Sequence, residues 1–192
     1  MKRHIITALK LFIFLTLLTG VIYPLVITLF ADVAFPEKSQ GSIIKKDGIL
    51  IGSELIGQKF VTDKYFWGRP SAIDYNPMPS GGSNLGPTSK ALLDSVNSRI
   101  DSIKNHQYVK PGEQIPKDLL FASASGVDPD IRPEDALFQV DRIAKARNFN
   151  SEQKKKLTEL VKKSVISPDL WIFGEDRVNV LNLNLALDKL VR

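Results

Sequence analysis

The fold of this chain is decided by residues 11–30, LFIFLTLLTGVIYPLVITLF, a run of 20 residues without a charged side chain. A helix of this length reaches about 30 Å, which matches the hydrocarbon core of a bilayer. A cleaved signal peptide has a shorter apolar core and a small-residue cleavage site, and Asp32–Ala34 makes a poor site. We therefore predict an uncleaved transmembrane helix over residues 11–31, preceded by a basic tail over residues 1–10.

The charges on the two sides of this segment predict its orientation. Lys2, Arg3 and Lys10 precede it, whereas acidic residues follow it. The positive-inside rule then places the N-terminus in the cytoplasm and the soluble part, residues 36–192, outside. Within the span, Gly20 and Pro24 have two interpretations, a tolerated kink or a notch that packs against another membrane helix.

Composition excludes several classes of function. The net charge is +5, but residues 1–31 carry +3 of it, so the soluble part is nearly neutral and we expect no nucleic-acid partner. The chain has no Cys and two His, which excludes a thiol nucleophile, a disulfide framework and a Cys/His zinc site. We also expect no cofactor of its own.

For the soluble part, the sequence predicts one α+β domain that mixes helices with antiparallel strands. A hairpin is predicted at Ser42–Gly52, where Lys46-Asp47-Gly48 forms a turn between apolar residues. Proline and glycine make residues 76–88 a loop. Three- and four-residue apolar spacing predicts helices from Ser89 to Asn105, from Pro133 to Asn148, from Asn150 to Val165 and from Leu183 to Val191, with a short strand at Val178–Val180.

Few residues suggest catalysis. The sequence contains no Walker A motif, no dinucleotide fingerprint and no Gly-x-Ser-x-Gly elbow. His106 is expected to pair with a helix end rather than act as a base. Asp128 and Asp130 could form an acid pair, the basis of an alternative function as a membrane-anchored extracytoplasmic hydrolase, although helix capping and turn formation explain them more simply. The Ser80-Gly81-Gly82-Ser83-Asn84 loop has the backbone freedom of an anion-binding nest, but a tight loop without a ligand uses the same residues.

Five segments taken together are more specific than any of these features. They are GSELIGQ at 52–58, YFWGRPSA at 65–72, SGGSNLGP at 80–87, ASASGVDP at 122–129 and VNVLNLN at 178–184. In this order and spacing they resemble the C subunit of Kdp-type potassium-transporting ATPases, from the membrane helix to the C-terminus.

The resemblance implies a non-catalytic accessory subunit of a bacterial plasma-membrane complex that imports potassium at the expense of ATP. The implied partners are a channel-like potassium-selecting subunit, a P-type ATPase subunit and a small membrane peptide. The chain itself lacks the Asp-Lys-Thr-Gly-Thr phosphorylation sequence and a Thr-Val-Gly-Tyr-Gly filter, and one span cannot enclose an ion path.

Two mechanisms remain for such a subunit, and they conflict; the resemblance implies the first, and the charge bias across the membrane favours the second. In one, the subunit is a catalytic chaperone that raises the ATP affinity of the ATPase subunit, with Ser80, Gly81, Gly82, Ser83 and Asn84 and the glutamine Gln139 near the nucleotide. In the other it is a clamp over the extracellular mouth of the potassium-selecting subunit, with its membrane helix packed into the complex. The predicted orientation favours the clamp because ATP is scarce outside, and an effect on ATP affinity could still be transmitted through the complex.

Overall fold

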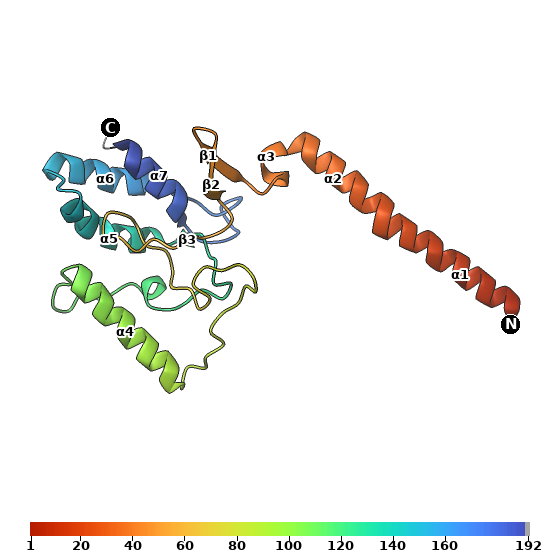
Figure 1. The fold of residues 1–192 in the computed structure, drawn as a ribbon, viewed down its shortest axis with the longest axis horizontal. Coiled ribbons are helices and arrows are strands. Elements are labelled where there is room, and N and C mark those ends of the chain that lie inside the picture. Colours follow the sequence, from red (N-terminus) through yellow and green to blue (C-terminus); the bar gives the residue numbers. More distant parts are fainter. Residues whose placement is uncertain (191–192) are drawn as a thin grey trace. The chain divides into compact units, whose positions relative to one another are not determined.

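The N-terminal apolar run forms one continuous helix in the computed structural model, which describes residues 1–190 (Figure 1). It consists of α1 (Lys2–Leu17), a π-helical turn η1 (Leu18–Ile22) and α2 (Tyr23–Ala34). Within the described residues this is the one helix long and apolar enough to cross a membrane, and none of its most apolar window is buried. The helix begins inside the predicted basic tail, at Lys2.

The π-helical turn coincides with the two residues singled out in the span. Gly20 lies inside η1, and Pro24 is the second residue of α2. Proline has no backbone N–H to donate to the carbonyl four residues earlier, so the regular pattern is interrupted in the turn before it. A side chain at Gly20 would meet no atom of this chain within 4 Å.

The chain divides after Ser53 into two compact units. The first contains, after the long helix, α3 (Pro36–Ser39) and the predicted hairpin of β1 (Ile43–Lys46) and β2 (Ile49–Ser53). Lys46 pairs with Ile49, so Asp47 and Gly48 form a two-residue turn, and both have positive φ as a type I′ turn requires. The prediction that residues 36–192 lie on the extracytoplasmic side stays a prediction.

The second unit mixes helices with a small antiparallel sheet, as predicted. The strands run in the order β3-β5-β4, with Val178 opposite both Ile131 and Val165. The elements of this unit are α4 (Lys90–His106), the 3-10 turn η2 (Lys117–Leu119), β3 (Asp130–Ile131), α5 (Pro133–Ala146), α6 (Ser151–Lys163), β4 (Val165–Ile166), β5 (Arg177–Asn179) and α7 (Val180–Leu190).

The main core lies between this sheet and helices α5, α6 and α7, which run side by side (Figure 1). Phe66 is fully buried there, and Phe60 and Tyr65 pack against the same cluster, so aromatic residues of the stretch 60–67 fill part of the core. Trp67 packs instead against a second cluster formed by Ile103, Leu119 and Leu120. The aromatic stretch therefore links the two clusters.

Some details of the sequence prediction are wrong. Val180 begins α7 instead of ending a strand. Its N–H still bonds to the carbonyl of Pro129, the residue before β3, but proline has no N–H to return the bond, so the ladder ends at Asn179. Leu93 and Leu137, which the apolar spacing of their helices would place in the core, are exposed. Each follows a less exposed apolar residue, Leu92 or Ala136, so an apolar pair in the sequence overestimates the width of the buried face.

Candidate functional site

The Ser80–Asn84 loop lies against the backbone of residues 124–126. Gly81 donates its N–H to the carbonyl of Ser125 at 3.0 Å. A Cβ at Gly82 would stand 3.0 Å from the carbonyl oxygen of Ala124, and a Cβ at Gly126 would overlap the carbonyl of Gly81. The glycines are therefore required by close approach of two backbone segments. Gly82 does not have a positive φ, so glycine is needed there because it has no side chain and not because of its backbone angles.

The other side of this loop is open. Ser80, Ser83 and Asn84 are exposed, and their side chains make no hydrogen bond within residues 1–190. The N–H groups of residues 82–85 also have no protein partner in that range. Asn84 adopts a positive φ of 53°, as is common for asparagine in turns. One side of the loop is therefore held by residues 124–126, while its other side exposes unpaired N–H donors. Such an arrangement suits a segment that contacts a partner.

Gln139 lies elsewhere, in the interior of the second unit, with 1% of its surface exposed. Its Oε1 accepts the N–H of Trp67 at 2.8 Å, and its Nε2 donates to the carbonyls of Trp67 at 3.1 Å and Asp135 at 3.2 Å. A guanidinium nitrogen of Arg142 donates to the same Oε1 at 2.6 Å. The amide group therefore has its hydrogen-bonding capacity filled inside the chain. No hydrogen bond within the described residues joins Gln139 to the Ser80–Asn84 loop.

Arg142 is the second member of this buried cluster, which we name the Trp67–Gln139–Arg142 cluster. Its side chain is buried, and it donates to the carbonyls of Asp63 at 2.9 Å and Tyr65 at 3.1 Å. The guanidinium also lies over the Trp67 ring, 3.8 Å from the centroid. Burial lowers the pKa of Arg142 to about 10, with the carboxylate of Asp63 opposing the shift. The cluster holds the segment 62–67 in place by its backbone.

Sequence reasoning missed this cluster, because it singled out Gln139 by resemblance alone and did not place Arg142 on the apolar face of its helix. Asp135, Gln139 and Arg142 recur at steps of four and three, on the face that also carries the buried Val140 and Ile143. That spacing is the signal that could have found them. Asp135 accepts the N–H of Arg132 at the start of α5, and burial raises its pKa to about 6 against the opposing effect of that hydrogen bond.

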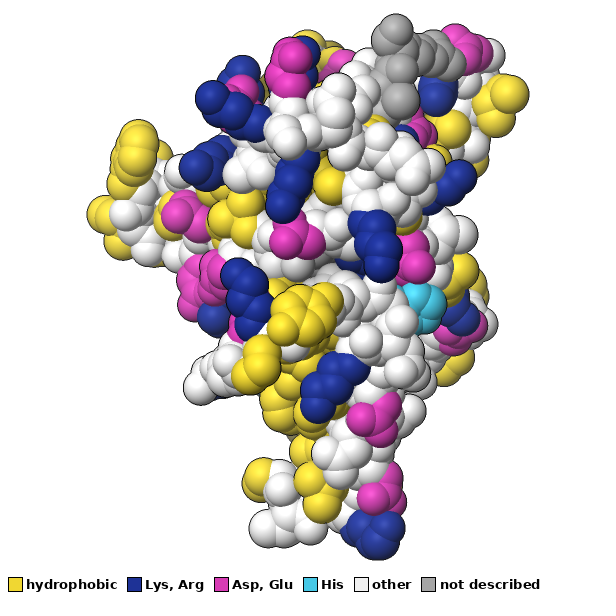
Figure 2. All heavy atoms as spheres, turned by 90° about the vertical axis from the view of Figure 1, so that its left-hand side faces the viewer, with side chains coloured by type: hydrophobic (Ala, Val, Ile, Leu, Met, Phe, Trp, Pro, Cys, Tyr) yellow, Lys and Arg dark blue, Asp and Glu magenta, His cyan; other side chains and the backbone are white. Residues whose placement is uncertain are grey.

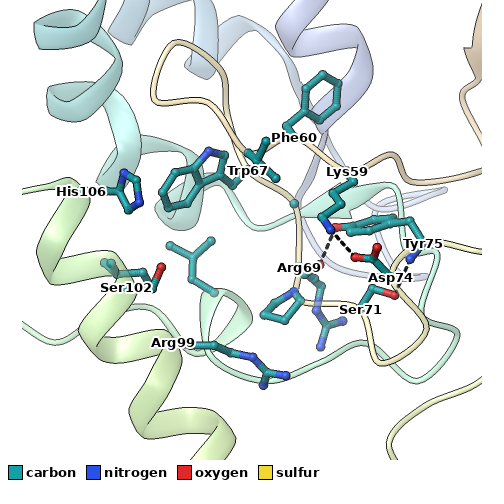
Figure 3. Close-up of a pocket in the computed structure, with 15 residues that line it drawn as sticks. Lys59, Phe60, Trp67, Arg69, Ser71, Asp74, Tyr75, Arg99, Ser102 and His106 are labelled. Carbon is teal, nitrogen blue, oxygen red and sulfur yellow. Dashed lines mark hydrogen bonds and ion pairs between the residues drawn. The ribbon is translucent and has the colours of Figure 1, made fainter.

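A pocket of about 360 Å³ lies next to this cluster, between α4 and the segment 59–75 (Figure 3). Trp67, Ser102 and His106 line one side and Lys59 and Asp74 the other. Its volume lies within the range of small-molecule sites. Neither the Ser80–Asn84 loop nor Gln139 lines it, so the residues linked to nucleotide by resemblance are not gathered around this cavity.

The polar groups of the pocket are mostly paired. Lys59 and Asp74 form an ion pair at 2.5 Å, and the hydroxyl of Tyr75 donates to the carbonyl of Arg69 at 2.5 Å. Burial, aided by the nearby Asp128, raises the pKa of Tyr75 to about 12. Arg99 donates to the carbonyl of Leu120 at 2.6 Å, and burial lowers its pKa.

His106 is the last residue of α4, as expected, but its polar partner is a side chain. Its Nδ1 lies 2.8 Å from a carboxylate oxygen of Asp63, and its ring packs edge-on against Trp67. His106 therefore connects α4 to the segment held by the Trp67–Gln139–Arg142 cluster.

The carboxylates of the alternative hydrolase function are held in ion pairs. Asp128 pairs with Arg69 at 3.0 Å and also accepts the N–H of Asp130, so it forms a turn as predicted. Asp130 lies 3.4 Å from Arg177, and burial raises its pKa. Neither caps the Pro133 helix, since Arg132 and Asp135 close that end instead, which corrects the capping prediction. The arrangement is a salt-bridge network rather than an acid pair poised for hydrolysis.

Comparison with known proteins adds to this geometry. Residues 5–189 match the family model described as KdpC, the c chain of K+-transporting ATPases.

The chain belongs to the KdpC family.

Curated relatives match along the whole sequence. The chain is 50% identical over 203 residues to a protein of Bradyrhizobium diazoefficiens and 48% identical over 202 residues to one of Rhodopseudomonas palustris, covering 98% of both chains in each comparison. It is 47% identical over 191 residues to a protein of Polynucleobacter asymbioticus, covering 98% of this chain and 99% of the relative. All three are named potassium-transporting ATPase KdpC subunit. The resemblance of the five segments is thus confirmed.

The family is that of one chain of K+-transporting ATPases, so the features described above belong to one subunit type of such an enzyme. Within residues 1–190, no group of three or more His, Asp or Glu residues is arranged to hold a metal ion. The main features of the described residues are an exposed apolar helix, a surface loop with unpaired backbone donors and a buried polar cluster.

Proposed function

We propose that this chain is the accessory C subunit of an ATP-driven potassium import complex and that it acts as an assembly clamp on the extracytoplasmic side. Its partners would be the potassium-selecting channel-like subunit, the P-type ATPase subunit and the small membrane peptide. The names of the relatives support membership of such a complex. In this role the chain performs no chemistry itself.

One observation carries the proposal, namely the apolar helix Lys2–Ala34, which buries none of its most apolar window within the chain. Such a helix needs a bilayer or other membrane helices around it. Gly20 leaves open space at the π-helical turn, and small residues allow another helix to approach closely. The helix therefore anchors the subunit and offers a packing notch at Gly20 and Pro24.

The same proposal treats ATP as an indirect ligand. Gln139 has its donors and acceptor filled by Trp67, Asp135 and Arg142, so a nucleotide would have to displace buried hydrogen bonds to reach it. The Ser80–Asn84 loop remains available as a contact segment for a partner. Support for ATP binding would then pass through the complex as a coupling between distant sites.

Co-extraction tests the assembly role. The chain is expressed with the other subunits, one of which carries an affinity tag, and recovery of the chain is measured after solubilisation. We expect Gly20→Leu to lower recovery and potassium uptake at limiting concentration, with Val26→Leu elsewhere on the span as the control. A wild-type chain recovered consistently without partners would overturn the proposal.

A further inference from the structure

Four consecutive large apolar side chains stand exposed in the connection between β4 and β5. Leu170, Trp171, Ile172 and Phe173, here named the apolar tip, are 78%, 87%, 77% and 64% exposed. Single exposed hydrophobic residues are ordinary, whereas a contiguous apolar patch marks a contact site. Tryptophan is moreover among the residues enriched in the energetic centres of protein interfaces.

The backbone holds this tip in a defined turn. Asp169 and Phe173 exchange both backbone hydrogen bonds, each 2.9 Å long. Within the turn, Leu170 and Trp171 have φ values of 54° and 65°. Bulky residues rarely adopt left-handed backbone, and such conformations concentrate at binding sites. The turn therefore presents its apolar side chains outward in a fixed arrangement, which lowers the entropic cost of docking.

Two uncompensated carboxylates flank the tip. Asp169 and Asp176 are exposed and make no ion pair within residues 1–190. The neighbouring Glu175 is paired with Arg132 at 3.2 Å, and Arg177 with Asp130 at 3.4 Å. A membrane surface with anionic headgroups would repel these carboxylates, while Lys or Arg side chains on a protein would attract them. The charge thus favours a protein partner over lipid.

We propose that the apolar tip docks into an apolar pocket, rimmed by Lys or Arg side chains, on another subunit of the same complex. This inference rests on the proposed function only in requiring a partner subunit. The tip supplies the buried centre of the contact, with Trp171 as its anchor, and Asp169 and Asp176 supply the polar rim.

A photo-crosslinking amino acid tests this docking in cells that express the full chain with the other subunits. Trp171→p-benzoylphenylalanine is irradiated, and the mass of the adduct is measured. Tyr108, which is 80% exposed, carries the same crosslinker as the control. We expect one discrete adduct between position 171 and one other subunit, and little from position 108. Reversing both charges with Asp169→Lys and Asp176→Lys should reduce the adduct roughly fivefold, whereas Glu159→Lys on α6 should leave it unchanged.

Other outcomes overturn the inference. A phospholipid adduct would mean that the tip inserts into the membrane, and an adduct of twice the chain mass would mean that a second copy covers it. No adduct at position 171, in cells where the chain co-extracts and potassium uptake is normal, would mean that the tip stays in water. That result would leave the proposed function standing, whereas failure of the wild-type chain to co-extract would refute the proposed function itself.

Discussion

The Ser80–Asn84 loop and the Trp67–Gln139–Arg142 cluster are both polar, yet they meet opposite surroundings. The loop is fixed on one side by backbone contacts with residues 124–126 and exposes its side chains on the other. In the cluster, Gln139 and Arg142 are buried, and their side chains form hydrogen bonds with backbone groups of Trp67 and Tyr65. Residues of similar chemistry therefore have different roles. Buried polar groups in the cluster stabilise the fold, whereas exposed polar groups in the loop can bind a partner. Mutations in the two regions should separate stability from assembly.

The largest effect is expected at Arg142. Arg142→Met removes a buried donor and leaves the carbonyls of Asp63 and Tyr65 without it. We expect the free energy of unfolding to fall by about 3–5 kcal/mol. Denaturant unfolding followed by tryptophan fluorescence measures this, with Lys145→Met, an exposed position on the same helix, as the control. A loss no larger than that of the control would show that the cluster is not structural.

Gln139 distinguishes structure from nucleotide contact. Gln139→Leu leaves the N–H and carbonyl of Trp67 unpaired in the interior, so we expect a loss of about 2–3 kcal/mol in unfolding free energy. The KM for ATP of complexes that have assembled should stay at the wild-type value. An altered KM for ATP together with unchanged unfolding would instead favour direct contact with nucleotide.

Asp135, beside the cluster, should make stability depend on pH. Its pKa of about 6 in the folded chain lies above the ordinary value of 3.8, so the folded state holds the proton more tightly. This stabilisation is fully present below about pH 4 and is lost as the pH rises through about 6. The unfolding free energy of the wild type relative to Asp135→Asn should therefore fall by about 2 kcal/mol from pH 4 to pH 7. A flat difference over that range would contradict the raised pKa.

The smallest effect on folding is expected in the loop. Gly82→Val places a side chain against the backbone of Ala124 and should cost about 1 kcal/mol in unfolding free energy while impairing potassium uptake at limiting concentration. Gly86→Val is the matched control, since a Cβ there would meet nothing within 4 Å. Equal uptake by both variants would show that the loop is not a contact segment.

The sequence predicted the elements better than the site. Apolar spacing located α4, α5 and α6 to within two residues at each end, and the Asp-Gly turn located the hairpin, because these signals are local. On the face shown in Figure 2, basic and acidic side chains are interspersed, which is consistent with the nearly neutral charge of the soluble part. The five segments identified the family because their order is specific.

What could not be predicted depends on contacts far apart in the chain. Gln139 is 72 residues from Trp67, and only the fold shows that its amide group is occupied there. The ion pairs of Asp128 and Asp130 likewise join them to Arg69 and Arg177. Helical spacing could indicate that Gln139 and Arg142 share the buried face of α5, but not which distant backbone groups they bind.

Labelling of a single cysteine tests the central claim most directly, that the Ser80–Asn84 loop faces the extracytoplasmic side and does not contact ATP. The chain has no Cys, so Ser83→Cys gives one reactive site in it, at an exposed position. Intact cells are treated with a membrane-impermeant maleimide, and permeabilised cells show that the thiol is reactive. We expect labelling of the chain before permeabilisation. Labelling only after permeabilisation would contradict the account and place the loop on the side where ATP is available.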